Sequence, residues 1–484
     1  MAKLRLIERQ VSSDAGTLEI YERLYSGRPD SFWLDTSALR DSHGWSFMGA
    51  MEGSRDHLLE ASEGIVTTTT RDGCSVVHEV PSVWNYLREL LDQYQLEGEA
   101  NSPFKGGYLG YLGYGLKTSV IAAAHAAKRV PDLALLFCSR WLAFDHITGR
   151  VFACAAFADD ECEQVESWVA SVESNLESVR ASLPARTRLA PVTDSSLAAF
   201  LRDTALDTRE QYESKVRECI DRIKDGDSYE ICLTTGFEGP ALDDPFAVYR
   251  ILRSVNPAPY AAYLDFGHVQ VLSSSPERFL RVTQERLVET KPIKGTALRL
   301  DNPEEDALAI ARLSTDPKMR AENMMIVDLL RNDLNKTCEV GTVRVDSLMH
   351  VESYQTLHQL VSTISGRLAD GCTSLDVIES CFPGGSMTGA PKLRTMEIIS
   401  DLEQHARAVY AGALGLLSLD GYTDLSIVIR TIVNDPERWF IGAGGAVLIN
   451  SDPAAEYLEM MSKASPSATA IVMSDEDKNQ GKPQ

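Results

Sequence analysis

The sequence predicts a mixed α/β fold of the α+β kind, and three observations support this class. Runs rich in leucine, β-branched and aromatic residues recur through the second half of the chain and are typical of strands. Between several of them lie stretches with apolar residues at helical spacing, such as 208–227. The two kinds of segment do not alternate regularly enough for a TIM barrel or a dinucleotide-binding fold. Candidate strands are residues 229–235, 261–266, 269–275, 354–366, 411–419, 425–433 and 439–449.

The chain divides by composition into an N-terminal part and a larger second part. Its 484 residues, 44% of them hydrophobic, can bury a substantial core in two or three domains or in one two-lobed unit. Residues 181–204 include a stretch biased toward Pro, Ser, Thr and Ala, which is typical of a linker. The sequence therefore predicts an N-terminal part at 1–180, this linker, a core at 205–470 and a disordered tail at 471–484.

Charge and cysteine content exclude several functional classes. The formal net charge is −23, from 47 basic and 70 acidic residues without a long block of one sign, so nucleic acid and anionic membranes are poor partners. Nine cysteines without a CxxC pair indicate a reducing compartment rather than a disulfide scaffold or a zinc site. The N-terminus shows no signal-peptide core, and no apolar run could span a bilayer. We expect a cytoplasmic enzyme.

A helix predicted at 316–334 carries a carboxylate on an apolar face. Asp316 is a good N-cap and Pro317 suits the first helical position. At helical spacing, Glu322 shares its face with Met319 and Ile326. A buried carboxylate without a partner is costly, so Glu322 needs a cation. That cation is either a lysine or arginine of another element, or a metal ion.

The last predicted helix repeats this design. Asp452 and Pro453 start it, and Glu456, Glu459 and Lys463 then lie on one face. Carboxylates from two helices, completed by water and substrate oxygens, suit Mg²⁺, which proteins often hold with only one or two carboxylates. The alternative is a solvated face with Glu-Lys ion pairs.

Two glycine-rich segments are suited to binding a small carboxylic acid. FPGGSMTGAPK at 382–392 leads into a helix, and FIGAGGAV at 440–447 ends a strand. Backbone N–H groups in such loops can bind anions, but neither segment has the spacing of a nucleotide-binding loop. Between them, Arg430 interrupts an apolar strand, where a guanidinium needs a paired anion such as a substrate carboxylate.

These motifs together resemble the chorismate-utilising enzymes, a family that includes anthranilate synthase component I, aminodeoxychorismate synthase component I, isochorismate synthase and salicylate synthase. The resemblance is dense from 205 to 466, where SSSPERF, the 316–333 helix, FPGGSMTGAPK, VIRT, GAGG and DPAAEYLEMMSK follow in this order. It is fainter at SPFKGGYLGYLGYGLK, 102–117. It implies an anthranilate-synthase-like fold, with two stacked antiparallel β-layers surrounded by helices, and Mg²⁺-dependent binding of chorismate near the centre.

The resemblance assigns the metal ligands and the proton donor. Glu322 and Glu459 match the metal-ligand positions, with Glu456 close by. Glu277 matches the general acid that assists departure of the C4 hydroxyl, and His358 matches the family's active-site histidine. Without the resemblance, Glu277 would be interpreted as an ion-pair partner of its neighbour and His358 as a core histidine.

The same comparison assigns the substrate-binding residues. Arg430 and Tyr410 would hold a carboxylate of chorismate. The others would line the site: Ser386 with its hydroxyl, Gly444 and Gly445 with backbone N–H groups, and Lys463 with its ammonium.

One lysine distinguishes the branches of the family. In ETKPIKGTALR, 289–299, Lys294 by itself would be interpreted as a surface lysine of a hairpin loop. However, anthranilate synthases usually read PIAGT, whereas PIKGT resembles the members that aminate C4. That likeness implies a covalent mechanism, in which the Lys294 amine attacks ring C2 and ammonia then adds at C4. A neutral amine is required, so we expect burial or nearby cations to lower the pKa of Lys294.

The resemblance also indicates that ammonia and not water is added to the ring, and it leaves alternatives for the reaction. Glu230 stands where the water-adding members carry a lysine, which argues against hydration. No cysteine lies in a GxCxG glutaminase motif, so we expect a separate glutamine amidotransferase partner to supply ammonia. At 33–36 the chain reads WLDT where feedback-regulated anthranilate synthases carry LLES, so the resemblance does not predict inhibition by tryptophan. The alternatives are amination at C2 and a non-catalytic, chorismate-binding regulatory subunit.

Overall fold

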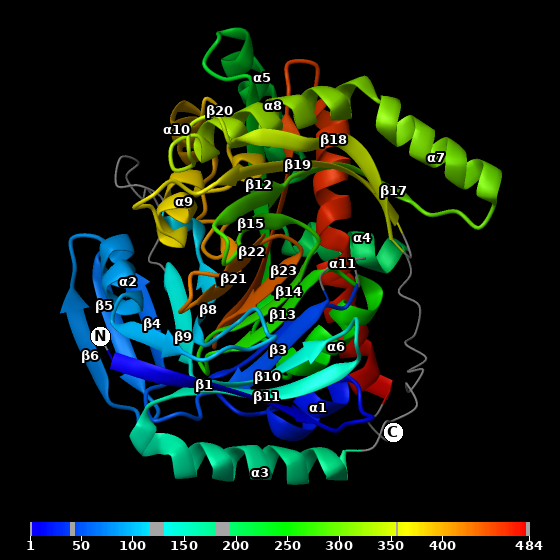
Figure 1. The fold of residues 1–484 in the computed structure, drawn as a ribbon. Coiled ribbons are helices and arrows are strands. Elements are labelled where there is room, and N and C mark those ends of the chain that lie inside the picture. The colour runs from blue at the N-terminus through cyan, green and yellow to red at the C-terminus, as the bar shows by residue number, and fades with distance from the viewer. Residues whose placement is uncertain (1, 39–43, 117–129, 180–193, 355–356, 481–484) are drawn as a thin grey trace.

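Two large sheets form the centre of the protein, and helices cover their outer faces (Figure 1). The structure, a computed structural model, describes the 484 residues except 1, 39–43, 117–129, 180–193, 355–356 and 481–484. The predicted mixed fold with two stacked, almost wholly antiparallel layers is confirmed. No helix in the described parts is long and apolar enough to cross a membrane.

The first sheet has twelve strands among the described residues, and all neighbours are antiparallel except the last pair. In spatial order they are β20 (Gly389–Ala390), β12 (Glu230–Pro240), β24 (Arg438–Val447), β23 (Thr431–Asn434), β14 (Gln270–Ser275), β13 (Tyr260–Asp265), β2 (Ser31–Asp35), β3 (Trp45–Ala50), β10 (Arg140–Asp145), β11 (Arg150–Phe157), β1 (Ala2–Val11) and β7 (Tyr94–Glu97).

The second sheet is antiparallel throughout its described pairs. Its order is β17 (Ile293–Leu298), β19 (Leu357–Arg367), β16 (Leu287–Lys291), β15 (Arg278–Val282), β22 (Thr423–Ile427), β21 (Ala413–Ser418), β8 (Gly107–Leu112), β9 (Leu133–Cys138), β4 (His57–Ser62), β5 (Ile65–Thr70) and β6 (Ser75–Glu79), while β18 (Arg344–Ser353) also pairs with β19.

Both halves of the chain contribute to both sheets. Strand β2 pairs with β13, and β8 pairs with β21, so N-terminal strands continue the sheets that C-terminal strands begin. One buried cluster contains side chains from both sheets, including Leu109, Trp141 and Leu264. The predicted parts at 1–180 and 205–470 therefore interleave within a shared core.

The helices bury their apolar faces on the outer side of one sheet or the other. Those with residues in the cluster on the first sheet are α1 (Thr17–Leu24), α3 (Cys162–Ser178), α4 (Asp194–Thr204), α5 (Arg209–Lys224), α6 (Pro245–Val255), α10 (Lys392–Leu402) and α11 (Pro453–Gln480). Those packed on the second sheet are α2 (Val83–Leu91), α8 (Pro317–Leu334) and α9 (Ser374–Cys381), with α7 (Pro303–Thr315) at its β17 end.

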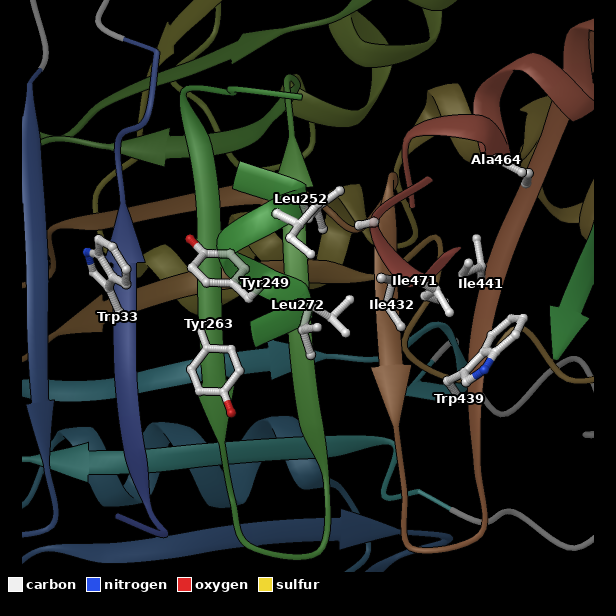
Figure 2. Close-up of a cluster of buried hydrophobic side chains, with 14 of the residues drawn as sticks. Trp33, Tyr249, Leu252, Tyr263, Leu272, Ile432, Trp439, Ile441, Ala464 and Ile471 are labelled. Carbon is white, nitrogen blue, oxygen red and sulfur yellow. The ribbon is translucent and has the colours of Figure 1, made fainter. Parts of the chain in front are cut away.

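Figure 2 shows how strand and helix residues meet in the cluster on the first sheet. Aromatic and aliphatic side chains of β2, β13, β14, β23 and β24 face those of α6 and α11. Ile471 of α11 belongs to this cluster and is buried. Burying such a side chain stabilises the fold by roughly 1.5–3 kcal/mol, which holds the last helix in place.

Two segments differ from the sequence prediction. Residues 194–204, expected to be a linker, form α4, because Leu201 is buried against the first sheet's cluster; the rest of that segment up to 193 lies outside the described residues. Residues 471–480, expected to be a disordered tail, continue α11, because its apolar side chains still find this cluster.

The two helices that carry the predicted metal ligands begin where the sequence predicts. Asp316 accepts a hydrogen bond from the N–H of Met319 at 2.9 Å, and Pro317 is the first residue of α8. Likewise Asp452 accepts from the N–H of Ala455 at 2.8 Å before α11. These caps fix the start of each helix and thereby the direction in which its glutamates point.

Candidate active site

Glu277 lies directly before β15 and is buried beside the glycine-rich loop. Its carboxylate is hydrogen-bonded to the hydroxyl of Ser386 and to the N–H of Ile293. Burial raises the pKa of Glu277 to about 7, against the lowering effect of Lys294 and Ser386. The adjacent Arg278 instead pairs with Glu289, so the simple ion-pair interpretation of Glu277 does not describe its contacts.

Lys294 of β17 is buried, with 9% of its surface exposed, and is not a surface lysine of a loop. Its Nζ donates to Glu230 Oε1 at 3.0 Å and lies 4.0 Å from Glu322 Oε2. Burial lowers the pKa of Lys294, but the negative charges of Glu230 and Glu322 outweigh it, and the net pKa is raised. This direction is opposite to the one expected from the sequence.

The backbone around Lys294 explains why a glycine follows it. Gly295 has a φ of +97°, and a Cβ there would lie 2.5 Å from the sulfur of Met319 in α8. A side chain at 295 would therefore push β17 away from α8. Since Glu322 also lies on α8, this close approach keeps Lys294 beside it.

The predicted metal ligands lie on facing parts of α8 and α11. Glu456 is 1% exposed, and its Oε1 accepts from Ser451 at 2.6 Å and from Lys318 at 2.8 Å. Its Oε2 is buried without a hydrogen-bond partner. Lys318 also lies 3.9 Å from Glu322 Oε1. Sequence reasoning overlooked Lys318, although its position one turn before Glu322 was visible.

Lys463 joins the C-terminal helix to the glycine segment. Its Nζ lies 2.7 Å from Glu459 Oε1 and donates to the carbonyl of Gly444 at 3.0 Å. Burial raises the pKa of Glu459, but the positive charge of Lys463 outweighs it and the net pKa is lowered. Glu459 is therefore an ionised carboxylate, as a metal ligand must be.

These residues fit a magnesium ion held by few protein ligands. In the described part of the chain, no three His, Cys, Asp or Glu side chains are grouped closely enough to form a complete cage. Glu456 nevertheless has a free buried oxygen, and a Cβ at Gly445 would lie 3.0 Å from it. The glycine thus leaves space beside carboxylates, which is the donor chemistry that Mg²⁺ takes together with water and substrate oxygens.

Arg430 and Tyr410 approach the site from the first sheet and its flank. Arg430, between β22 and β23, has a φ of +51°, and its Nη1 donates to Asn256 at 3.2 Å. Burial lowers its pKa despite the charge of Glu277. The ring of Tyr410 lies against Gly442, where a Cβ would be only 2.2 Å from a ring carbon. The glycine of GAGG therefore makes room for the tyrosine.

A buried ion pair supports the glycine-rich loop. Arg407 pairs with Glu403 at 2.7 Å and donates to the carbonyls of Met387 at 2.6 Å and Cys232 at 2.7 Å. The guanidinium thereby connects the loop that holds Ser386 to β12, the strand of Glu230. The two residues are four apart in the sequence but lie after the last residue of α10, so a helical pattern did not mark them as a buried pair.

His358, on the strand that pairs with β17, makes its hydrogen bonds to residues outside the group of carboxylates and lysines. One ring nitrogen lies 2.9 Å from Asp306 Oδ1 of α7, and the other lies 2.7 Å from Ser353 Oγ of β18. Both nitrogens are thus engaged, as in a satisfied core histidine. Its catalytic role stays a prediction.

The candidate site carries little net charge. Four carboxylates and Glu277, whose pKa of about 7 leaves it partly protonated at neutral pH, face four cationic side chains, so a dianionic substrate would need further positive charge. The groups are Glu230, Glu277, Glu322, Glu456 and Glu459, against Lys294, Lys318, Lys463 and Arg430.

Comparison with known proteins gives consistent matches. The profile of the chorismate binding enzyme family matches residues 44–469. An aminodeoxychorismate synthase of Streptomyces griseus is 40% identical over 96% of this chain, which spans only 64% of that relative. Anthranilate synthase component 1 of Thermus thermophilus is 37% identical over 98% of this chain and 99% of its own. The structure of anthranilate synthase component I from Streptococcus pneumoniae has a TM-score of 0.70 at 27% identity, covering 96% of this chain and 99% of that one.

Proposed function

The chain belongs to the family of chorismate binding enzymes, and from that premise we propose that it aminates chorismate at C4. The product would be 4-amino-4-deoxychorismate, as for component I of an aminodeoxychorismate synthase. The observation that carries this proposal is Lys294, a buried amine held at 3.0 Å by Glu230 within a cluster of site carboxylates. The name of the Streptomyces griseus relative supports it.

The first half of the proposed reaction uses Lys294 and Glu277. Lys294 gives a proton to Glu230, and its Nζ then forms a bond to ring C2. The double-bond electrons shift toward C4, and the C4–O bond breaks as Glu277 donates its proton to the departing hydroxyl, which leaves as water. A pKa of about 7 keeps a large share of Glu277 protonated at neutral pH, as this step requires.

The second half reverses the allylic shift. Ammonia forms a bond to C4, the two ring double bonds return to their original positions, and the C2–N bond to Lys294 breaks. The new C4 ammonium gives a proton to Glu277 and the released Lys294 amine takes its proton back from Glu230, so both carboxyl groups return to their starting states. Arg430 and Tyr410 would hold a substrate carboxylate, with Ser386, Gly444, Gly445 and Lys463 lining the same space. His358, with both ring nitrogens hydrogen-bonded, would support the site by holding α7 and β18 against β19.

Magnesium would complete the charge balance of the site. Glu322 and Glu459 would hold it, with the free oxygen of Glu456 close by. The ion would supply positive charge to bind and orient the ring carboxylate of the substrate.

Ammonia would come from a separate glutamine amidotransferase. None of the nine cysteines of this chain lies in a glutaminase motif. The aminated product would serve the formation of 4-aminobenzoate, a folate precursor, or a related compound, after a distinct lyase has acted. Free cysteines throughout the described residues agree with a cytoplasmic location.

Amination at C2 is the second candidate, because the Thermus thermophilus relative is named as an anthranilate synthase component and matches almost end to end. A non-catalytic subunit that binds chorismate is the third. One experiment separates them: the purified protein is incubated with chorismate, Mg²⁺ and ammonium, and products are identified by mass-resolved chromatography. We expect 4-amino-4-deoxychorismate. Anthranilate would refute the proposal, and no turnover even with an added glutaminase would favour the non-catalytic subunit.

Replacing the nucleophile tests the covalent mechanism. Lys294→Ala should abolish C4 amination, because no other amine replaces its bond to C2. The matched control is Lys291→Ala, since Lys291 lies three residues away and pairs with Glu352 at 3.4 Å instead of with the site carboxylates. The control should keep its activity. C4 amination retained in Lys294→Ala would exclude the covalent step.

A further inference from the structure

Lys318 links the two helices that carry the candidate metal ligands. Its Nζ donates to Glu456 of α11 at 2.8 Å and lies 3.9 Å from Glu322 of its own helix, α8. Glu459 also lies within its electrostatic reach. One ammonium thus contacts Glu456 and lies near Glu322, two of the carboxylates at the proposed metal site.

The helix does not favour a lysine at this position. Lys318 is the second residue of α8, where the positive end of the helix dipole repels a cation. Its ammonium is therefore held by the carboxylates and not by the helix end. The side chain is 37% exposed, and its flexible four-carbon stem allows the ammonium to move into solvent.

A divalent cation would compete with this ammonium. The Glu456 oxygen that lies beside Lys318 already accepts from Ser451, while the other oxygen is buried and unpartnered. An ion held by Glu322 and Glu459 would compete with the Lys318 ammonium for the negative charge of Glu322, and the two cations would repel each other. Metal binding therefore requires Lys318 to withdraw or costs free energy if it stays.

We propose that Lys318 is a built-in counterion of the metal site, which neutralises Glu456 and Glu322 and sets how tightly the site binds a divalent cation. The inference rests on the proposed function, because it uses the same metal site. In this inference Lys318 is a positioning residue. Its ammonium holds Glu456 and Glu322 close together without metal and moves away from them when the metal binds. Removing its charge should strengthen metal binding.

The test is metal binding to the full-length protein without chorismate. Free Mn²⁺ is followed by electron paramagnetic resonance, and Mg²⁺ binding is followed by calorimetry, for the wild type, Lys318→Met and Lys318→Gln. The glutamine variant retains a hydrogen-bond donor toward Glu456 and protects against loss of folding. We expect both variants to bind Mn²⁺ roughly tenfold more tightly, the scale on which residues around metal ligands alter affinity.

The control variant is Lys336→Met. Lys336 follows the other end of α8 and pairs with Asp333 at 2.8 Å, away from the site carboxylates, so its loss should leave the Mn²⁺ affinity unchanged. Melting temperatures add a second readout: Lys318→Met should melt lower than the wild type without metal, and added Mg²⁺ should raise it more than it raises the wild type.

The outcomes separate this inference from the proposed function. If the wild type binds Mn²⁺ and the Lys318 variants bind equally or more weakly, Lys318 is only a structural tie and the inference fails, while the metal site stands. If the wild type binds neither Mn²⁺ nor Mg²⁺, the proposed metal site and this inference both fail, while C4 amination is decided separately by the product assay with chorismate and ammonium.

Discussion

Removing the hydroxyl of Ser386 should move the pH dependence of the reaction upward. Ser386 hydrogen-bonds to Glu277, and this bond favours the ionised carboxylate and lowers its pKa. A general acid must be protonated, so kcat/KM should fall as pH rises through about 7, the pKa of Glu277. Ser386→Ala removes the stabilisation of the ionised form, and the falling limb should move to higher pH.

The size of the shift follows from the contacts of Glu277. A hydrogen bond to a charged group contributes about 1.5–3 kcal/mol, and one pKa unit corresponds to about 1.4 kcal/mol. The N–H of Ile293 and the charges of Lys294 and Lys463 remain in the variant and partly compensate. We therefore expect the falling limb to rise by about one pH unit, the low end of the range.

The assay is kcat/KM for chorismate between pH 6 and 9, with the concentration of unprotonated ammonia held constant. Thr388→Val is a suitable control in the same loop, since it removes a hydroxyl that bonds to the carbonyl of Gly384 and not to Glu277. A downward shift in Ser386→Ala, or an unchanged limb, would refute the assignment of Glu277 as the acid. A wild-type profile with no falling limb near pH 7 would do the same.

Two further substitutions test the support of the site. Arg407→Met should lower the free energy of unfolding by about 3–5 kcal/mol, measured by urea denaturation, because it leaves Glu403 buried without its partner. Adding Glu403→Gln should recover part of that loss. Gly442→Ala should raise KM for chorismate and also lower the melting temperature, because its Cβ displaces the buried ring of Tyr410; an unchanged KM would mean that Tyr410 does not contact substrate.

The sequence predicted those features of the fold and site that depend on residues close together in the chain. Proline after aspartate predicted the starts of α8 and α11, and apolar spacing placed Glu322 on the inner side of its helix. Each of these features depends on residues within one or two turns of each other, so a single chain segment contains the whole signal.

What sequence reasoning could not supply are contacts between distant segments. The helical end of the chain depends on Ile471 finding the first sheet's cluster, and composition alone made that segment look disordered. The partner of Arg278 is Glu289 and not the adjacent Glu277, because antiparallel pairing of β15 with β16 brings them together. No local pattern distinguishes these partners.

The state of Lys294 follows from such a distant contact. Lys294 lies in the second sheet and Glu230 in the first, 64 residues apart, so their 3.0 Å contact exists only when the two layers are packed together. Burial alone would favour the neutral amine, yet Glu230 and Glu322 reverse the direction and keep it protonated. In the proposed mechanism the nucleophile therefore starts as an ammonium, and its activation would include transfer of one proton. Because Glu230 already accepts a hydrogen bond from Lys294, that transfer would need no rearrangement of the fold, only a change in the charge around the pair on binding of the proposed anionic substrate with its metal ion.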